Sequence, residues 1–574
     1  MLIDILRSFT RPYRGRIAVI TLLVLAQVVI SLYLPALNAD IINNGVATGN
    51  INYIWQVGFE MLGHTAVSVV VSVGAAYLTA FVSMSFARDL RATVFRTVLD
   101  FNAQDVDHFG TPSLITRNTN DIQQVQLLVT MGLSMLLMAP LTMIGGVIMA
   151  LAHNLRMSIL IAVAVPLMAL VIGLMMRVAI PQFRTIQTRI DRINGVLREQ
   201  ITGMRVIRAF VRDDFEQARF ADANDALRET SLRINRIFAL AMPMLMLILN
   251  FSTIGVVWFG AHLVSTGDMQ IGDISAFLSY LMQILISVMM ATMAAMLVPR
   301  AAASAERIKA VLDVVPTITD PAQPTPQVTP GAVEFRNVSF RYPGAEEPVL
   351  RSIDFHIAPG EFTAIVGGTG SGKTTLINLL ARFHDVTDGT VLVGGVDVRE
   401  QARAELYRGL ALVLQRAYLF GGSVRDNVRF GAQDITDDEV WRALEIAQAA
   451  DFVRELDNGL DHEIAQGGQN LSGGQKQRMA IARAVALHPR IYVLDDSFSA
   501  LDAATDARLR ASLQREMAGS TVIVVAQRVS TVLHADRIIV LDEGAIAGIG
   551  THDELLATCT AYREIVGSQL GANA

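Results

Sequence analysis

The first 300 residues alternate long apolar stretches with connections rich in arginine. The apolar stretches contain no Asp, Glu, Lys or Arg and comprise residues 17–39, 61–87, 122–155, 157–176, 237–267 and 274–299. Each supplies the roughly 20 residues that a helix needs to cross a bilayer. The pattern therefore predicts six membrane-spanning helices.

The arginines predict the orientation of these helices. Residues 177–236 contain twelve arginines, and Arg88, Arg91, Arg96 and Arg117 lie in the earlier long connection. The connections on the opposite side contain only Arg156. Because positive residues are retained on the cytoplasmic side, we expect both termini and both long connections to be cytoplasmic.

The two long connections keep the apolar spacing of helices. In the second, apolar residues recur at helical intervals, at Ile190, Ile193, Val196, Leu197 and Ile201. We therefore predict that the spans continue into the cytoplasm. Each pair is expected to turn back through a short transverse helix, near Gln104–Pro112 and near Arg208–Glu216, and these turns are expected to touch the soluble part of the chain.

The remaining polarity pattern gives the domain boundaries. Residues 1–16 mix apolar positions with arginines, which predicts an amphipathic helix on the inner membrane surface. The six-helix domain covers residues 17–315, and a segment rich in Pro, Thr and Gln at 316–330 is predicted to be a linker. From 331 to 574, short β-branched runs alternate with helical segments, which is typical of an α/β domain with a mostly parallel sheet. The runs 364–366, 491–494 and 521–526 are predicted to be buried strands of this sheet.

Composition agrees with a membrane half and a soluble half. The chain has 574 residues, of which 52% are hydrophobic and 17% charged, with a mean hydropathy of +0.42. Soluble proteins usually carry more charge. The net charge of −6 gives no sign of a nucleic-acid partner. The single cysteine, Cys559, excludes an internal disulfide.

A glycine-rich run in the soluble half points to phosphate binding. It fits the pattern G-x-x-x-x-G-K-[ST] and comprises Gly367, Gly368, Thr369, Gly370, Ser371, Gly372, Lys373 and Thr374, followed by Thr375. Glycines let backbone N–H groups surround phosphate oxygens, the lysine reaches the β- and γ-phosphates, and Thr374 would hold Mg²⁺. Downstream, Asp495 ends the apolar run 491–494, which is the layout of a carboxylate that helps to hold Mg²⁺.

Further motifs extend this pattern over the whole chain. They are the run Leu471, Ser472, Gly473, Gly474 and Gln475, then Gln415, the aromatic Tyr342, and Asp502 in the segment 499–502. With six spans before them, these motifs resemble the half-transporters of the ABC exporter family. In that family one six-helix membrane domain precedes one P-loop nucleotide-binding domain.

The resemblance implies roles for these residues. Tyr342 is expected to stack on adenine, Gln415 to join Thr374 and Asp495 around Mg²⁺, and Asp502 to lie in the D-loop. Two nucleotide domains of the family face each other head to tail. ATP then lies between the P-loop of one chain and the signature 471–475 of the other, so one chain cannot complete a site.

Two residues depart from the family pattern. The position after Asp495 is normally Glu, which activates the attacking water, and here it is Asp496. The side chain of Asp is one methylene shorter than that of Glu, and catalysis is sensitive to displacements of about 1 Å in the position of a catalytic group. The His that normally contacts the γ-phosphate is replaced by Gln527, which cannot be protonated. The segment Ala465-Gln466-Gly467 also replaces the usual Gly-Glu-x.

These departures predict a degenerate site that binds ATP and hydrolyses it slowly, in one subunit of a heterodimer whose partner has the usual Glu and His. Two other interpretations stay open. In the first, Asp496 is competent and the protein is a homodimer. In the second, the chain is a regulatory subunit that gates another membrane protein. The motifs do not fix the direction of transport.

The spans give a weaker prediction about cargo. Ionisable residues are nearly absent from them, and polar candidates are Gln27, Asn38, His64, Asn250, His262, Tyr280 and Gln283. Methionines crowd several spans, and thioethers adapt to varied apolar shapes. We expect a hydrophobic or amphipathic substrate, such as a lipid or a drug. The family resemblance suggests a bacterial inner membrane, so membrane lipid is a further expected partner.

Overall fold

The computed structural model describes residues 1–498, 501–526 and 532–570, which divide into two compact units. The first, here the helical unit, comprises Met1–Asp100 and Phe109–Val314. The second, here the sheet unit, comprises Phe101–His108 and the chain from Val315 onward.

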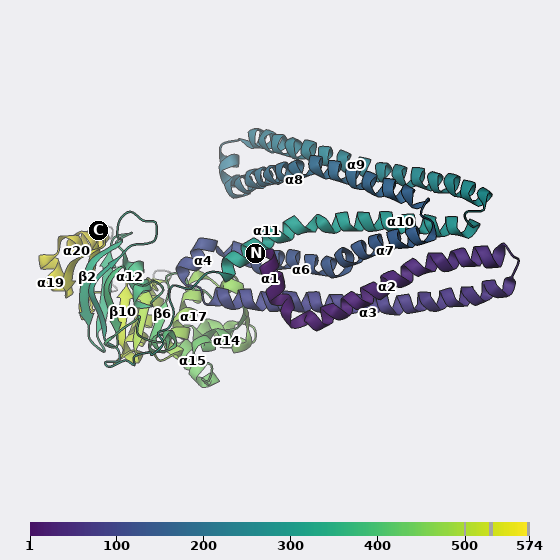
Figure 1. Cartoon of the computed structure of the whole chain (residues 1–574). Helices are drawn as coiled ribbons and strands as arrows, with labels where there is room; N and C mark the ends of the chain where they lie inside the picture. Colours follow the sequence, from purple (N-terminus) through teal and green to yellow (C-terminus); the bar gives the residue numbers. More distant parts are fainter. Residues whose placement is uncertain (499–500, 527–531, 571–574) are drawn as a thin grey trace. The chain divides into compact units, whose positions relative to one another are not determined.

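The helical unit is built from long helices (Figure 1). Its elements are α1 (Leu2–Thr10), the 3₁₀ turn η1 (Arg11–Tyr13), α2 (Arg14–Asp40), η2 (Ile41–Val46), α3 (Ile51–Leu99), α5 (Thr111–Thr116), η3 (Arg117–Asp121), α6 (Ile122–Met131), η4 (Gly132–Leu136), α7 (Leu137–His153), α8 (Ser158–Ala209), α9 (Asp213–Thr266), α10 (Ile271–Ala295) and α11 (Leu297–Leu312). The segments η2, η3 and η4 are π-helical, so they continue the helices around them.

Within the described residues, these elements form six continuous helices that are long and apolar enough to cross a membrane. They run over Leu2–Val46, Ile51–Leu99, Thr111–His153, Ser158–Ala209, Asp213–Thr266 and Ile271–Leu312. Each contains nearly all of one apolar stretch, which confirms the six predicted helices. At 1.5 Å per residue, the 49 residues of α3 are more than twice as long as a bilayer core of about 30 Å is thick. The helices therefore extend well beyond the membrane.

Polar side chains inside the helical unit join neighbouring helices. Asn38 donates from Nδ2 to Ser275 Oγ at 3.0 Å, and Gln283 donates from Nε2 to the Ser31 carbonyl at 3.2 Å. Both contacts tie α2 to α10. These two cargo candidates are therefore engaged in helix packing.

A buried ion pair lies in the extension of these helices. Asp121 has no exposed side-chain surface, and it accepts hydrogen bonds from Arg307 Nε at 2.7 Å and from Ser304 Oγ at 3.1 Å. A second guanidinium nitrogen of Arg307 also donates to Asp121. The pair fastens η3 to α11, the last helix before the predicted linker.

Only the first of the two predicted transverse helices is present in the described residues. It is α4 (Ala103–Phe109), most of which belongs to the sheet unit. Near Arg208–Glu216 the prediction is wrong, because three residues, Phe210 to Arg212, connect α8 directly to α9.

The local chemistry explains this tight turn. The Arg212 N–H donates to the Ile207 carbonyl, the Val211 N–H donates to the Arg208 carbonyl, and Val211 has a φ of 52°. This is the Schellman arrangement that ends a helix. Asp213, Asp214 and Glu216 then favour an immediate helix start, since acidic side chains stabilise a helix N-terminus.

The sheet unit contains two main sheets. The six-stranded sheet has the order β12 (Ala545–Gly550), β11 (Arg537–Asp542), β3 (Phe362–Gly367), β10 (Thr521–Val525), β9 (Ile491–Asp495) and β6 (Leu410–Val413). All neighbours are parallel except β12 with β11. The apolar runs predicted as strands form β3, β9 and β10, which confirms the parallel sheet.

The second sheet is antiparallel, with the order β2 (Leu350–Ile357), β1 (Val333–Phe340), β4 (Asp388–Val393) and β5 (Val396–Asp397). A third, two-stranded sheet pairs β7 (Gly422–Ser423) with β8 (Glu463–Ile464). The helices are α12 (Lys373–Leu380), α13 (Arg403–Gly409), α14 (Val424–Val428), α15 (Asp437–Ile446), α16 (Ala450–Glu455), α17 (Gly473–Ala486), α18 (Ala503–Glu516), α19 (His552–Thr558) and α20 (Thr560–Leu570). Short 3₁₀ turns occur at η5 (Arg429–Gly431), η6 (Gly459–Asp461) and η7 (Gln466–Gly468).

Strand β3 separates the two apolar cores of the sheet unit. Ala364 and Val366 contribute to one core and Ile365 to the other, because successive side chains of a strand point to opposite faces. Both faces of β3 are therefore buried, and the loop that follows it starts from a fixed point.

The predicted linker lies against the sheet unit. The Thr325 N–H donates to the Glu400 carbonyl at 2.8 Å, and the Val328 and Thr329 N–H groups both donate to the Gly394 carbonyl at 2.8 Å. The segment 316–330 therefore has irregular structure but a defined path.

Candidate functional site

The glycine-rich loop leaves β3 and leads into α12, as its pattern predicted. A Cβ on Gly367 would lie 2.3 Å from the Leu541 carbonyl oxygen, and one on Gly372 would lie 2.5 Å from Leu350 Cδ2. Gly370 has a φ of 84°, which favours glycine, and a Cβ on Gly368 or Gly370 would meet no atom within 4 Å. The loop is thus packed on one side and open on the other.

Lys373 bends back over this loop. Its Nζ donates to the carbonyls of Gly367 at 2.9 Å and Gly368 at 2.6 Å. Burial lowers the pKa of Lys373, while the charges of Asp495 and Asp496 act in the opposite direction. The ammonium group is therefore held close to the open side of the loop.

Asp495 ends β9 and is buried. Burial raises the pKa of its carboxyl group, and the charge of Asp496 raises it further. The charge of Lys373 and a hydrogen bond from the Thr374 side chain oppose this shift. Thr374 and Asp495 are thus brought together, as expected for a pair that holds Mg²⁺.

Asp496 and Gln415 meet at the same edge of the sheet. Strands β6 and β9 are parallel, with Val413 opposite Leu494, so the residues that follow both strands emerge side by side. Gln415 Nε2 donates to Asp496 Oδ2 at 3.1 Å. Asp496 has a φ of 47°, a region that Asp tolerates better than most residues, and its N–H donates to the Val525 carbonyl.

Tyr342 lies beside the start of α12. Its hydroxyl is 3.2 Å from Thr375 Oγ1, and its ring is edge-on to that of Phe340, with 4.9 Å between centroids. The ring is only partly buried, so one part of it is available to a ligand. The structure therefore places this predicted adenine contact next to the glycine-rich loop.

The signature 471–475 forms the start of α17. Leu471 is buried, whereas Ser472 and Gly473 are exposed. The Ser472 side chain accepts a hydrogen bond from the Gln475 N–H at 3.3 Å, and Gln475 Oε1 accepts from the Ser472 N–H at 2.8 Å. This capping box fixes an exposed helix N-terminus, which is suited to binding an anion.

The other predicted residues are placed as follows. Asp502 caps α18 by accepting from the Thr505 N–H at 2.9 Å. Ala465 precedes η7, and Gln466 and Gly467 are its first two residues, with a φ of 70° at Gly467. Gln527, like residues 499 and 500 of the D-loop, lies outside the described residues.

The residues present suit ATP and Mg²⁺. The loop has an open side bordered by the ammonium group of Lys373, and the hydroxyl of Thr374 lies next to the carboxylate of Asp495. Hydroxyl and carboxylate oxygens are the ligands that Mg²⁺ prefers. When bound, Mg²⁺ would neutralise charge on the phosphates of ATP.

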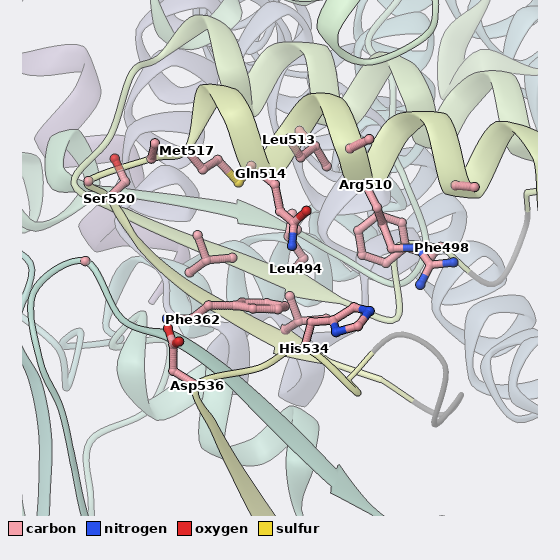
Figure 2. A pocket seen from close by; sticks show the side chains of 17 residues that line it. Phe362, Leu494, Phe498, Arg510, Leu513, Gln514, Met517, Ser520, His534 and Asp536 are labelled. Carbon is pink, nitrogen blue, oxygen red and sulfur yellow. Dashed lines mark hydrogen bonds between the residues drawn. The ribbon is translucent and has the colours of Figure 1, made fainter. Parts of the chain in front are cut away.

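A separate cavity of about 530 Å³ lies between α18 and the six-stranded sheet (Figure 2). Phe362, Leu494 and Met517 supply apolar walls, and His534 and Asp536 line it as well. Among the described residues, those assigned to ATP, Mg²⁺ or the signature do not line this cavity, although Leu494 directly precedes Asp495. It was not expected from the sequence, because its lining comes from segments that are distant along the chain.

The chain matches two family models. Residues 17–289 match the ABC transporter transmembrane region, and residues 350–499 match the ABC transporter model. It is 45% identical to an ABC transporter ATP-binding protein of Mycobacterium tuberculosis (strain CDC 1551 / Oshkosh), over 99% of this chain and 98% of the relative. The chain belongs to the ABC transporter family.

A further relative supports this assignment, and a solved structure shows the fold. The chain is 32% identical to an ATP-dependent lipid A-core flippase of Syntrophus aciditrophicus (strain SB), over 87% of this chain and 84% of the relative. It has the same fold as a bacterial Atm1-family ABC exporter with ATP bound, with a TM-score of 0.81 over 97% of this chain and 98% of the other and 24% identity. The family carries an ATP-hydrolysing domain, and the membrane-spanning helices make this chain a multi-pass membrane protein.

Proposed function

We propose that this chain is one subunit of a heterodimeric ATP-driven exporter. Its own ATP site, formed by 367–375, Tyr342, Gln415 and Asp495, binds Mg²⁺-ATP and hydrolyses it slowly. Its signature, 471–475, completes the hydrolytic site of a partner half-transporter. ATP closes the two nucleotide domains, the spans open outward, and hydrolysis at the partner's site resets the cycle.

The observation that carries the proposal is the contact between Asp496 and Gln415. The carboxylate at the position of the usual Glu is one methylene short, and it is hydrogen-bonded to a side chain that the family resemblance assigns to Mg²⁺. A general base must reach the attacking water at hydrogen-bond distance. A carboxylate held back toward Gln415 is poorly placed for that role, while Lys373, Thr374 and Asp495 retain what ATP binding needs.

The exposed N-terminus of α17 supports the second half of the proposal. Its Ser472 and Gly473 lie on the surface with the capping box intact, as a site that serves another chain requires. A regulatory subunit that only sensed ATP would not need this feature. The homodimer remains the direct rival, because it would use the same signature.

We further propose an amphipathic lipid or drug as cargo. A cavity of about 270 Å³ lies among α8, α9 and α10 within the helical unit, and its lining is apolar except for Thr292. The methionines among its lining residues are Met175, Met176, Met289, Met293 and Met296. Flexible thioethers adapt to varied apolar ligands, and the flippase among the relatives is named for a lipid.

The experiment that tests the heterodimer is purification of the tagged chain from its native membrane at single-copy expression. The proposal expects a second half-transporter at a one-to-one ratio, with Glu at the position that Asp496 occupies in this chain. Recovery of a dimer that contains only this chain would contradict the heterodimer and favour the working Asp496 site. Recovery with a channel would favour the regulatory subunit.

A further inference from the structure

The loop Arg382–Asp385, which follows α12 and precedes β4, has an unusual backbone. Arg382 has a φ of 52° although it is not glycine, and its side chain is 5% exposed. Such a conformation persists only where the surroundings over-determine it. Three parts of the sheet unit surround this loop: the segment 316–330, α4 and the nucleotide site.

The first direction is the segment that enters the sheet unit from the helical unit. Arg382 donates from one guanidinium nitrogen to the Thr319 carbonyl at 3.1 Å, and from Nε to Asp385 at 3.2 Å. Thr319 lies in the segment 316–330, directly after α11. Arg382 therefore holds the loop against the segment 316–330 within the sheet unit.

The second direction is α4, most of which lies in the segment Phe101–His108 of the sheet unit. Asn102 caps α4 through reciprocal bonds with Asp105 and also donates from Nδ2 to Thr317 Oγ1 at 2.6 Å. Further along α4, the charge of Asp107 acts on His384, where it raises a pKa that burial lowers more strongly. Asn102 and Arg382 therefore both bind the start of the segment 316–330, at Thr317 and at Thr319, so this segment connects the loop to α4.

The third direction is the nucleotide site. The ring of His384 is edge-on to the ring of Tyr342, with 5.4 Å between centroids and an interplanar angle of 83°. It also lies 5.5 Å from the ring of Phe340. Because Tyr342 in turn contacts Thr375 of α12, ring contacts connect His384 to the nucleotide site, while its neighbour Arg382 binds the segment 316–330.

We propose that His384 is a positioning residue that holds the Tyr342 ring in place for adenine. Through the loop 382–385, it also transmits the presence of bound adenine to the segment 316–330 and to α4. The ligand chemistry that it senses is a purine base rather than the phosphates. This inference rests on the proposed nucleotide site. It names a specific side chain through which the nucleotide site affects α4 and the segment 316–330.

The charge state of His384 should modify this link. The titratable groups that face it are Asp107 on α4, Asp385 on its own loop and Tyr342 beyond β1. Burial keeps the imidazole neutral down to a lower pH than usual. Below that pH the positive charge of His384 is attracted by the carboxylate of Asp107 on α4.

The test compares ATP with inorganic tripolyphosphate, using the full-length chain in lipid nanodiscs. In His384→Ala, the Kd for ATP should rise by about 2- to 10-fold, the equivalent of one aromatic contact, while the Kd for tripolyphosphate stays unchanged. His384→Phe should restore ATP affinity, because it restores the ring. His356→Ala, an exposed histidine on β2, is the matched control and should change neither.

A second readout is hydrogen exchange of residues 101–108. ATP should slow this exchange in the original chain, and tripolyphosphate should not. The ATP effect should be lost in His384→Ala. The slowing of exchange by ATP should also change as the pH falls through the pKa of His384. In Asp107→Asn this change should occur at a lower pH, because the charge that raises the pKa of His384 is removed.

The outcomes separate the two proposals. Equal weakening of ATP and tripolyphosphate in His384→Ala, or unchanged protection of 101–108 by ATP, overturns the role of His384. Binding of neither ligand by the original chain, with no difference from Lys373→Ala, overturns the nucleotide site itself.

Discussion

The helical unit and the sheet unit use their polar residues in different ways. In the sheet unit, the functional residues follow the carboxyl ends of the parallel strands β3, β6 and β9, where Gln415 contacts Asp496. In the helical unit, polar residues such as Asn38 and Asp121 are engaged with neighbouring helices. Motifs in the sheet unit therefore indicate chemistry, whereas polar residues in the helical unit mainly indicate packing.

The largest effect expected from this difference concerns Asp121. Asp121→Asn removes the charge that neutralises Arg307, and breaking a buried ion pair costs about 3–5 kcal/mol. Because Arg307 is 48% exposed, we expect the lower end, about 3 kcal/mol. Thermal unfolding of the chain in lipid should show the loss, while ATP binding at 25 °C stays intact.

The matched control is Asp225→Asn on α9. The pair of Asp225 with Arg228 is exposed, with 68% and 64% of the side-chain surfaces accessible. Such pairs contribute about 0–1 kcal/mol. Equal destabilisation by the two substitutions would mean that the ion pair of Asp121 with Arg307 does not stabilise the fold more than an exposed pair does.

The next effect separates the two motifs of the sheet unit. In the assembled pair, Ser472→Ala should lower ATP turnover by about 100-fold, since it removes a donor to the partner's phosphate. Lys373→Ala should abolish ATP binding at this chain's own site and lower turnover less. Steady-state hydrolysis by the reconstituted pair measures both.

Thr551→Ala controls for helix capping. Thr551 caps α19 with the same reciprocal bonds that Ser472 makes at α17, so either substitution removes about 1 kcal/mol of capping. Thr551→Ala should leave turnover unchanged. A larger loss for Lys373→Ala than for Ser472→Ala would contradict the division of roles between the two motifs.

A smaller effect is expected at Asp496. Asp496→Glu lengthens the side chain by one methylene and should raise hydrolysis at this chain's own site by about 10-fold, given the sensitivity of catalysis to displacements near 1 Å. Single-turnover hydrolysis, with the partner's site disabled, isolates the change. No increase in a folded, ATP-binding variant would mean that Asp496 is not what limits this site.

The smallest effect concerns pH. Burial and the charge of Asp496 raise the pKa of Asp495, so its ionised form is lost at a higher pH than for an ordinary aspartate. The part of ATP binding that depends on Mg²⁺ should therefore weaken as the pH falls through that raised pKa. In Asp496→Asn the loss should move to lower pH, because the like charge is absent. ATP titrations with and without Mg²⁺ across pH measure this shift.

Much of the fold could be predicted from the sequence. The six helices followed from uninterrupted apolar stretches, and β3, β9 and β10 followed from β-branched runs beside recognisable motifs. The tight turn at Val211 was missed, because a β-branched residue gives no signal for a left-handed conformation. The antiparallel sheet β2-β1-β4-β5 was also missed, since its pairing depends on contacts between distant segments.

The candidate site shows the same limit. Motif spacing correctly brought Thr374 to Asp495, and the sheet register brought Gln415 to Asp496. The loop Arg382–Asp385 was not found, because neither its positive φ nor its contacts with Thr319 and Tyr342 leave a pattern in the sequence. The identity of the transported substrate also could not be predicted from the sequence, since an apolar cavity lining built from methionines resembles ordinary helix packing.

The most direct test of the central claim is to measure ATP binding and ATP hydrolysis in parallel, on this chain purified alone in lipid. The account predicts saturable binding that Lys373→Ala abolishes, together with almost no turnover. Rapid turnover that disappears in Lys373→Ala would contradict it and would establish a working homodimer in which Asp496 serves as the catalytic carboxylate.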